Sequence, residues 1–531
     1  MERTENDVLG DVTVAYLHEL DINNLPTPKE IQTNLIYLFK REFEVENVLK
    51  PKIYHWKSPR ELGNFVIAEI ILKLHEVRRL LWLGTEQDDN CDLVVYQNSG
   101  KYEGIYVKDK LFFVRLIKSY NRNISDKALN EIINELVHSA PVCWREDDPD
   151  LTAVNNGIFN YKKKQLQPFS PDYVFTSKSA VDYNPMATSP KIHNDVDNTD
   201  WDVDSWVESL SDDKELQLLL WQVIGSTIRP HVKWNKVICF YSVQGNNGKG
   251  TLCELMRNLC GKSSCASIPF ADFAKEFMLS QLTHISAVIT DENDTNDFTK
   301  AAGSLKAVIT GDPLTINRKF KEPITIQFNG AMVQCMNDLP KFGDRSESLY
   351  RRFLLIPFNK CFTGQERKYI KDDYLHRTEV LEYVLFKVLN MTYDEFSEPA
   401  VCLDLMAEYK VFNDPVRQFL GEILTKLAWD LVPYQFLYDL YVAWCRRNNP
   451  SGSVAKKSQV IKQVREILKK DKIWEIKDSP QPTRNHMDKP EVLISEYNLT
   501  NWTNTVYKGD DYSRIGMPNN LSTSYTGLKR S

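Results

Sequence analysis

A glycine-rich loop between two apolar runs constrains this chain more than any other feature. Residues 237–241 form a short apolar run, and residues 252–259 form an amphipathic one. This pattern predicts a buried strand, a tight loop and a helix, with backbone N–H groups and the positive helix N-terminus facing an anion. The predicted phosphate-binding residues are Gly245, Asn246, Asn247, Gly248, Lys249, Gly250 and Thr251.

The loop departs from the usual G-x-x-x-x-G-K-[ST] pattern at two positions. Val243 stands where the first glycine is expected, and Gly250 occupies the usual position of the metal-binding hydroxyl residue. We therefore expect Thr251 to serve as the Mg²⁺ ligand, while Lys249 contacts the β- and γ-phosphates of ATP. The alternative is a Gly/Asn turn that only joins a strand to a helix.

Two acids follow the next apolar run. Residues 285–290 read as a buried strand, and Asp291 and Glu292 come directly after it. At the carboxyl end of a parallel strand, Asp291 would hold Mg²⁺ through water and Glu292 would act as general base toward the attacking water. The alternative is an acidic helix cap after a strand.

A basic hairpin is predicted further along the chain. A helix over residues 305–312 stops at Gly311, and residues 314–326 show two β-branched arms around a basic, aromatic tip. Lysines suit phosphates and a phenyl ring suits stacking, so the tip could contact single-stranded DNA. A solvated turn is the alternative. The tip residues are Arg318, Lys319, Phe320 and Lys321.

Two more polar positions flank predicted strands. Asn337 follows the apolar run 331–336 and could position the attacking water, although Asn-Asp turn chemistry is the alternative. Arg351 and Arg352 precede the run 353–358. An arginine that reaches the γ-phosphate of a neighbouring subunit is an arginine finger, and a surface arginine pair is the alternative.

Order, spacing and residue type along residues 245–358 resemble superfamily 3 helicases, which are AAA+-like hexameric motors of viruses, phages and plasmids. The resemblance implies that Lys319 and Phe320 grip single-stranded DNA. It also implies that Arg352, rather than Arg351, is the finger. Ring assembly and 3′→5′ travel are further expectations from the resemblance.

A second resemblance covers the segment before the loop and some residues after it. Residues 156–159, 167–171 and 182–185, together with Asp344 and Ser346, are similar to phage/plasmid primase-helicases and poxvirus-type helicases. The resemblance extends over roughly residues 150–450. Within this group, the chain most resembles the Rep initiator-helicases of staphylococcal pathogenicity islands.

Four regions are expected. They are an N-terminal region of unassigned role (1–135), a pre-motor segment and linker (136–200), the motor (201–410) and a C-terminal domain (411–531). The predicted fold class is α/β, with a P-loop AAA+/superfamily 3 core, a mixed α+β N-terminal region and a C-terminal winged helix.

Three local features of the flanks are predicted before and around the linker. The N-terminal region should contain a long helix over residues 62–83 and a hairpin over residues 92–107. We expect the Asp/Asn-rich stretch 189–204 to be the linker.

The C-terminal domain shows a helix–turn–helix–strand order. Leu437, Leu440, Tyr441 and Trp444 mark one amphipathic helix, and residues 456–471 mark a second. A strand over residues 473–476, a polar wing and a strand over residues 492–494 should follow. The second helix would enter the major groove of duplex DNA, unless it is only a solvated basic face. Its expected DNA-facing residues are Lys457, Lys462, Arg465 and Lys469.

Charge and cysteine content limit how this chain can contact DNA and in which compartment it is expected. The net charge is −6 over 531 residues, so DNA must meet a local basic patch or a ring of subunits. The ten cysteines show no zinc spacing and read as reduced thiols, and no apolar run is long enough to span a membrane. We expect a cytoplasmic protein of a bacterial host, without membrane contact.

The leading hypothesis is an ATP- and Mg²⁺-dependent homo-hexameric DNA helicase. It would hold single-stranded DNA in its pore, recognise duplex origin DNA and work with host replication proteins. A nucleotide-dependent DNA-binding switch without unwinding, a small-molecule nucleotide kinase and a primase-helicase remain alternatives.

Overall fold

A computed structural model describes most of the chain. The described residues are 3–21, 24–48, 50–83, 90–275, 277–293, 302–319, 321–340, 346–448, 454–469 and 471–531. The chain divides into two compact units, one of residues 1–344 and 351–403 and the other of residues 345–350 and 404–531. Within the described ranges, no helix is both long enough and apolar enough to cross a lipid bilayer.

The N-terminal region combines helices with a four-stranded sheet, ordered β3-β2-β1-β4. Ile67, Ile70 and Ile71 are fully buried between the helices, as their helical spacing predicts. The elements are α1 (Glu5–His18), α2 (Pro28–Asn47), α3 (Asn64–Leu74), β1 (Val77–Leu80), β2 (Asp92–Tyr96), β3 (Tyr106–Val107), α4 (Lys110–Tyr120), α5 (Asp126–Ser139) and β4 (Val142–Cys143).

The helix expected over residues 62–83 is wrong beyond Leu74. Residues 77–80 form strand β1, which pairs antiparallel with β2 and parallel with β4. These two ladders satisfy the backbone of β1, so tertiary pairing overrides its local helical pattern. The hairpin expected over residues 92–107 is confirmed, because β2 pairs antiparallel with β3.

Small sheets connect this region to residues 201–410, the region predicted to be the motor and called the motor below. Strands β5 (Leu151–Val154), β6 (Gly157–Asn160) and β7 (Gln165–Gln167) form one antiparallel sheet. The linker expected over residues 189–204 is instead a hairpin of β8 (Ile192–Asn194) and β9 (Thr199–Trp201). Asn198, at a φ of 54°, supplies its turn, and the buried Trp201 joins the motor core.

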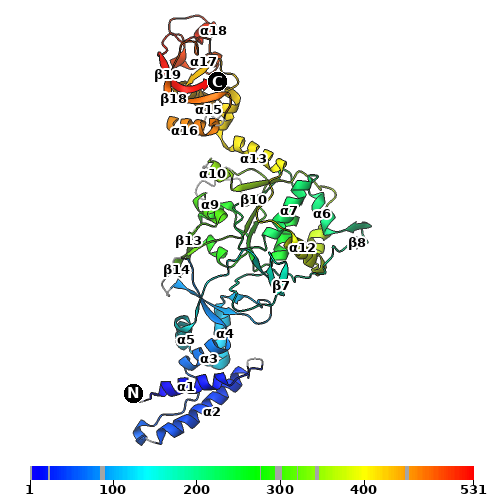
Figure 1. Ribbon diagram of the computed structural model, residues 1–531, viewed down its shortest axis with the longest axis vertical. Coiled ribbons are helices and arrows are strands. Elements are labelled where there is room, and N and C mark those ends of the chain that lie inside the picture. The colour runs from blue at the N-terminus through cyan, green and yellow to red at the C-terminus, as the bar shows by residue number, and fades with distance from the viewer. Residues whose placement is uncertain are drawn as a thin grey trace. The chain divides into compact units, whose positions relative to one another are not determined.

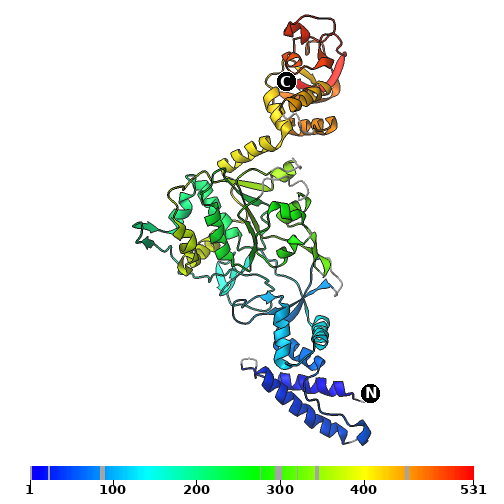
Figure 2. The same ribbon diagram turned by 180° about the vertical axis from the view of Figure 1, so that it is seen from behind.

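A five-stranded parallel sheet forms the centre of the motor, in the order β11-β12-β15-β10-β16. In Figure 1, α7 and α12 lie together on one side of β10, and α9 and β13 lie on the other. The reverse view in Figure 2 shows the same separation. The strands are β10 (Val237–Tyr241), β11 (Cys265–Ala266), β12 (Ala287–Thr290), β15 (Ala331–Met336) and β16 (Phe353–Pro357).

The helices of the motor bury apolar faces against this sheet, in a core that α7, α8 and α12 share with β10 and β15. The hairpin predicted after Gly311 is confirmed as β13 (Leu314–Arg318) and β14 (Lys321–Ile326). The helices are α6 (Val203–Ser209), α7 (Lys214–Ser226), α8 (Lys249–Cys260), α9 (Ala302–Thr310), α11 (Lys368–Asp372) and α12 (Thr378–Asn390).

The C-terminal unit has its own apolar core, which includes Leu437, Leu440, Tyr441 and Trp444, as predicted. A sheet in the order β17-β19-β18 packs with it. Beyond the short α10 (Glu347–Tyr350), the elements are α13 (Ala400–Asn413), α14 (Pro415–Ile423), β17 (Leu431–Pro433), α15 (Tyr434–Asn448), α16 (Lys457–Leu468), β18 (Trp474–Pro482), α17 (Val492–Glu496), α18 (Tyr512–Ile515) and β19 (Ser524–Arg530).

The strand expected over residues 492–494 is wrong. That segment is helix α17, capped by the Glu491 carboxylate, which accepts a hydrogen bond from the backbone N–H of Leu493. Strand β18 pairs instead with β19 near the C-terminus. A short apolar run fits a helix or a strand equally well, and here the cap decides.

Candidate functional site

The glycine-rich loop lies between β10 and α8, as its flanks predict. Gly248 has a φ of 88° and immediately precedes α8, a conformation that favours glycine. The Asn247 side chain holds the turn, because it donates to the backbone oxygen of Gln244 and accepts from the N–H of Lys249 at 3.3 Å. The loop is therefore shaped to present α8's first N–H groups to an anion.

Lys249 and Asn337 are brought together across two adjacent strands. The Lys249 Nζ lies 3.0 Å from Asn337 Oδ1 and 3.3 Å from the backbone oxygen of Ser242. The lysine is 7% exposed, and burial lowers the pKa of its ammonium group. Both oxygens are neutral, so these contacts orient the ammonium group without cancelling its charge.

Asp291 and Glu292 follow β12, one strand beyond Asn337. Both are exposed, and Asp291 Oδ1 lies 2.8 Å from Arg257 Nη2 of α8. Asn293 fixes this end of β12, since its amide donates to Gln334 Oε1 at 2.9 Å and to the backbone oxygen of Cys335 at 3.0 Å. Sequence analysis missed both roles, because only the fold brings Arg257 to Asp291 and the partners of Asn293, Gln334 and Cys335, to this end of β12.

The residues at this end of the sheet fit a magnesium ion. Thr251 lies in the first turn of α8, and Asp291 directly follows the buried strand β12. A hydroxyl and a carboxylate are the oxygen ligands that Mg²⁺ takes, with water and phosphate completing its shell. The ion would supply charge neutralisation between the phosphates.

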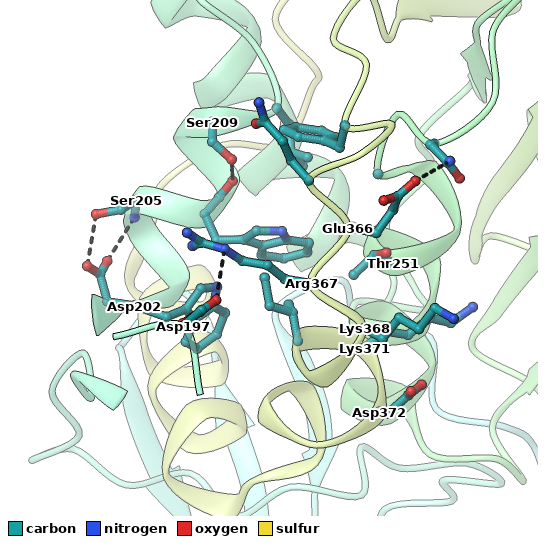
Figure 3. Close-up of a pocket in the computed structure, with 18 of the residues that line it drawn as sticks. Asp197, Asp202, Ser205, Ser209, Thr251, Glu366, Arg367, Lys368, Lys371 and Asp372 are labelled. Atoms are coloured by element: carbon teal, nitrogen blue, oxygen red, sulfur yellow. Dashed lines mark hydrogen bonds and ion pairs between the residues drawn. The ribbon is translucent and has the colours of Figure 1, made fainter. Parts of the chain in front are cut away.

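A cavity of about 830 Å³ opens beside the loop, a volume within the usual range for ligand sites. Figure 3 shows Thr251 and Glu366 on one side of it and Asp197 and Asp202 on the other. Asn246 joins the loop to the segment 362–366, because its amide donates to Glu366 Oε1 at 2.9 Å. The rest of a nucleotide whose phosphates meet the loop therefore has room here.

Arg352 lies at the amino ends of the sheet strands, whereas the loop lies at their carboxyl ends. Its backbone oxygen accepts from the N–H of Val237, at the start of β10, and β16 follows it in parallel register. A parallel strand rises about 3.3 Å per residue, so the loop begins roughly 13 Å away. The structure therefore does not bring Arg352, or the exposed Arg351, to Lys249 of the same chain.

The hairpin residues divide by their surroundings. Arg318 is 9% exposed, and its Nη1 lies 3.0 Å from Asp92 Oδ1 in β2. Lys321 also contacts Asp92 but is 49% exposed, and Lys319 is exposed. Phe320 lies outside the described residues. Arg318 thus serves the interior of the protein, and Lys319 and Lys321 remain the cations that DNA could reach.

Two thiols lie beside the loop, and sequence analysis missed them. Cys253 Sγ and Cys335 Sγ are 3.3 Å apart, and the ligand atoms of both lie within 4.8 Å of the Asp291 carboxylate. The two cysteines are 82 residues apart. A search for zinc-ligand spacing cannot find such a pair, because β15 brings it to α8 only in the fold.

Helix α16 of the C-terminal unit presents basic residues outward. Val460, Val464 and Leu468 are buried, as predicted, and Lys462 and Lys469 are exposed. Two of the expected DNA-facing residues have protein partners, since Lys457 donates to Gln435 and Arg465 lies 2.6 Å from Asp478 Oδ1.

Comparisons with known families match three separate segments. Residues 39–201 match the family described as D5 N terminal like, and residues 412–504 match the family described as Poxvirus D5 protein-like. Residues 240–352, which include the loop, Asp291, Asn337 and Arg352, match a family of unknown function, DUF5906.

One curated viral protein and several solved structures are also similar. The protein named "Putative helicase 022R" of Frog virus 3 (isolate Goorha) is 24% identical over 264 residues, which cover 44% of this chain. The match spans only 27% of the viral protein's length. Two apo structures of the NrS-1 C-terminal region are 14% and 13% identical, with TM-scores of 0.41 and 0.42. They cover 77% and 80% of this chain, and 86% and 98% of their own.

The observed architecture is a mixed α/β fold around a parallel sheet. The two D5-like matches and the viral relative together support a relationship of this chain to the poxvirus D5-like family.

Proposed function

We propose that this protein is an ATP-hydrolysing DNA helicase that initiates replication of a mobile genetic element. It works as a homo-hexameric ring, travels 3′→5′ on single-stranded DNA and interacts with host replication proteins. The observation that carries the proposal is the contact between Lys249 and Asn337, with Asp291 and Glu292 directly after the adjacent strand β12. The carboxyl ends of the strands thus gather a lysine that could bind phosphate, an amide and two carboxylates.

This end of the sheet divides the work of hydrolysis among its residues. The loop N–H groups and Lys249 hold the β- and γ-phosphates, while Thr251 and Asp291 are the residues that would hold Mg²⁺. Glu292 accepts a proton from the attacking water, and Asn337 orients that water next to the γ-phosphate. Cleavage needs charge stabilisation and positioning more than covalent chemistry, so these residue types suffice.

Arg352 completes the site of a neighbouring subunit. It lies at the amino ends of the sheet strands, away from the loop of its own chain, and this position supports a role at an adjacent subunit's nucleotide. Arg352→Ala should bind ATP but hydrolyse it about 1,000-fold more slowly, as loss of a finger does elsewhere. Mixing it with Glu292→Gln subunits should restore part of the activity, measured as phosphate release across mixing ratios. Failure to recover any activity at any ratio would argue against the finger acting between subunits.

The C-terminal unit binds the duplex origin. From α14 onward its order is helix, strand, two helices, strand, two short helices and a final strand, with β19 between β17 and β18 in the sheet. The run β17-α15-α16-β18 with β19 pairing beside β18 supports the proposed winged-helix domain. The exposed Lys462 and Lys469 of α16 would meet the DNA backbone as the helix enters the major groove.

Strand displacement tests the proposal directly. Forked duplexes with a 3′ or a 5′ single-stranded tail are mixed with full-length protein and ATP, and the released strand is followed by fluorescence. Strand release is expected only from the substrate with the 3′ tail. ATP binding without displacement from either substrate would instead support a nucleotide-dependent DNA-binding switch.

A further inference from the structure

The N-terminal sheet holds the base of the hairpin through one buried carboxylate. Asp92, the first residue of β2, is 1% exposed. Its oxygens lie 2.7 Å from Lys108 Nζ, 3.0 Å from Arg318 Nη1 and 3.1 Å from Lys321 Nζ. The indole N–H of Trp82 also donates to it at 3.1 Å. A residue of the N-terminal region thus organises cations from both sides of a junction.

Asn90 and Leu83 add further contacts across the same junction. The amide of Asn90 donates to the backbone oxygen of Pro323 at 2.7 Å, and its Oδ1 accepts from Arg318 Nη2 at 2.6 Å. Leu83 forms a β-bridge with Thr325 of β14. These contacts attach the base of the hairpin to the N-terminal region.

Asp92 does not cancel the positive charge around it. Burial opposes its ionisation, yet Lys108, Lys321 and Arg318 together hold the pKa of its carboxyl below the usual value. A cavity of about 580 Å³ lies at this junction, and four cations and two carboxylates line it. The cations are Lys108, Arg318, Lys319 and Lys321, and the carboxylates are Asp92 and Asp109.

Two of these lysines can bind Asp92 and an anion at once. Lys108 and Lys321 are 45% and 49% exposed, so both ammonium groups meet solvent as well as the carboxylate. An ammonium group has three N–H donors, and one hydrogen bond to Asp92 leaves donors for another oxygen. Tyr102, 37% exposed, lines the same cavity and offers a ring for stacking.

We propose that this cavity binds the phosphate backbone of single-stranded DNA, with Lys108 of the N-terminal region and Lys321 of the hairpin as phosphate contacts and Asp92 as the residue that positions them. This inference rests on the proposed helicase function. It gives Lys108 and the sheet strands β1 and β2 a role in gripping the strand, so that the hairpin and the N-terminal sheet both hold the DNA.

Binding of a fluorescein-labelled oligo(dT) to full-length protein, followed by anisotropy at several salt concentrations, tests the site. Lys108→Ala should weaken binding about 3- to 10-fold and reduce the slope of log K against log salt by about 0.7, the value for one lost phosphate contact on a single strand. Lys108→Arg should restore both. Lys110→Ala, an exposed lysine two residues along and outside the cavity lining, is the matched control.

The double variant Lys108→Ala/Lys321→Ala adds a second test. Its loss of oligo(dT) affinity should differ from the sum of the two single losses, because two lysines that contact one phosphate site do not contribute independently. Unchanged affinity and slope in Lys108→Ala would overturn the site while leaving the helicase proposal intact. So would an equal loss in Lys110→Ala, since it would reveal only a general electrostatic effect. Wild-type protein that binds no oligo(dT) at all would overturn both the helicase proposal and this site.

Discussion

Lys249 and Arg318 are both basic residues in segments predicted to meet phosphates, and both are nearly buried, at 7% and 9% exposed. Their partners differ. Lys249 contacts the neutral oxygens of Asn337 and Ser242, whereas Arg318 contacts the carboxylate of Asp92. Lys249 therefore keeps a positive charge that these contacts do not neutralise, whereas Arg318 forms an ion pair that holds the base of the hairpin.

This comparison shows that residue type and burial do not identify a phosphate-binding cation. For a nearly buried cation, the charge of its neighbours matters as well, because a buried ion pair balances itself and loses strongly when one partner is removed. Lys108 and Lys321 differ from Arg318 because they are about half exposed and keep donors for a further anion. At the loop, the protein surrounds a cation with amides and leaves an anion to be supplied. At the hairpin, the protein supplies the anion itself.

The largest effect is expected at the loop. Lys249→Ala should slow ATP hydrolysis about 100- to 1,000-fold, since it removes the positive charge placed for the phosphates. Phosphate release under saturating ATP measures this, with Lys262→Ala, an exposed lysine after α8, as the control. Hydrolysis at the wild-type rate would remove the loop from the ATP site. Duplex binding by the C-terminal unit should persist.

Removing the charge at the hairpin should act on stability. Asp92→Asn should lower the free energy of unfolding by about 3–5 kcal/mol, because it leaves Arg318 without its carboxylate. Because its folded pKa is lowered, the contribution of Asp92 is present above its unfolded pKa, about 3.9. It is lost as pH falls through the folded value. Urea unfolding at pH 7 and at progressively lower pH measures both.

Glu103→Gln, which alters an exposed carboxylate of the same region, should change stability by less than about 0.5 kcal/mol. An Asp92→Asn variant as stable as the wild type at pH 7 would mean that the ion cluster does not hold the hairpin. The structural role given to Arg318, in contrast to Lys249, would then be refuted.

Exchanging the partner type at the loop is expected to have an intermediate effect. Asn337→Asp places a carboxylate next to Lys249, as Asp92 is placed next to Arg318, and should weaken ATP binding about tenfold by cancelling the lysine charge. Asn337→Ala should keep ATP affinity within about threefold but slow hydrolysis, because the water-orienting amide is lost. Titration with a fluorescent ATP analogue separates the two. Equal affinities for both variants would refute the role given to partner charge.

The smallest effect is expected on α16 of the C-terminal unit. Lys462→Ala and Lys469→Ala should each weaken binding to duplex origin DNA about two- to fivefold and reduce the salt slope by about 0.9. Anisotropy at several salt concentrations measures this. Lys426→Ala, whose lysine is 45% exposed and pairs with Glu422, serves as the control. A control that weakens binding as much as the α16 variants would place the duplex surface elsewhere.

Much of the motor could be predicted because its signals are local. The strands of the parallel sheet are short apolar runs, and Gly248 and Gly311 mark the turns that precede and follow helices. The errors occur where local signals conflict with distant partners. Residues 77–80 pair with β2 and β4 instead of extending α3, and residues 492–494 follow a helix cap.

The candidate site divides in the same way. Its residue types at strand ends were visible in the sequence, but their partners were not. Arg318 meets Asp92 across 226 positions, and Cys253 meets Cys335 across 82. No periodicity or spacing rule links residues so far apart, and so the inward role of Arg318 was not predictable from the sequence.

ATP hydrolysis by the full-length protein, with and without a single-stranded oligonucleotide, tests the central claim most directly. The proposed function places the ATP site at Lys249 and a DNA surface at Lys321 in one motor. On that proposal, DNA should stimulate phosphate release several-fold, and Lys249→Ala should show neither basal nor stimulated release. A hydrolysis rate that saturating single-stranded DNA leaves unchanged would contradict the claim that this end of the sheet drives a DNA motor.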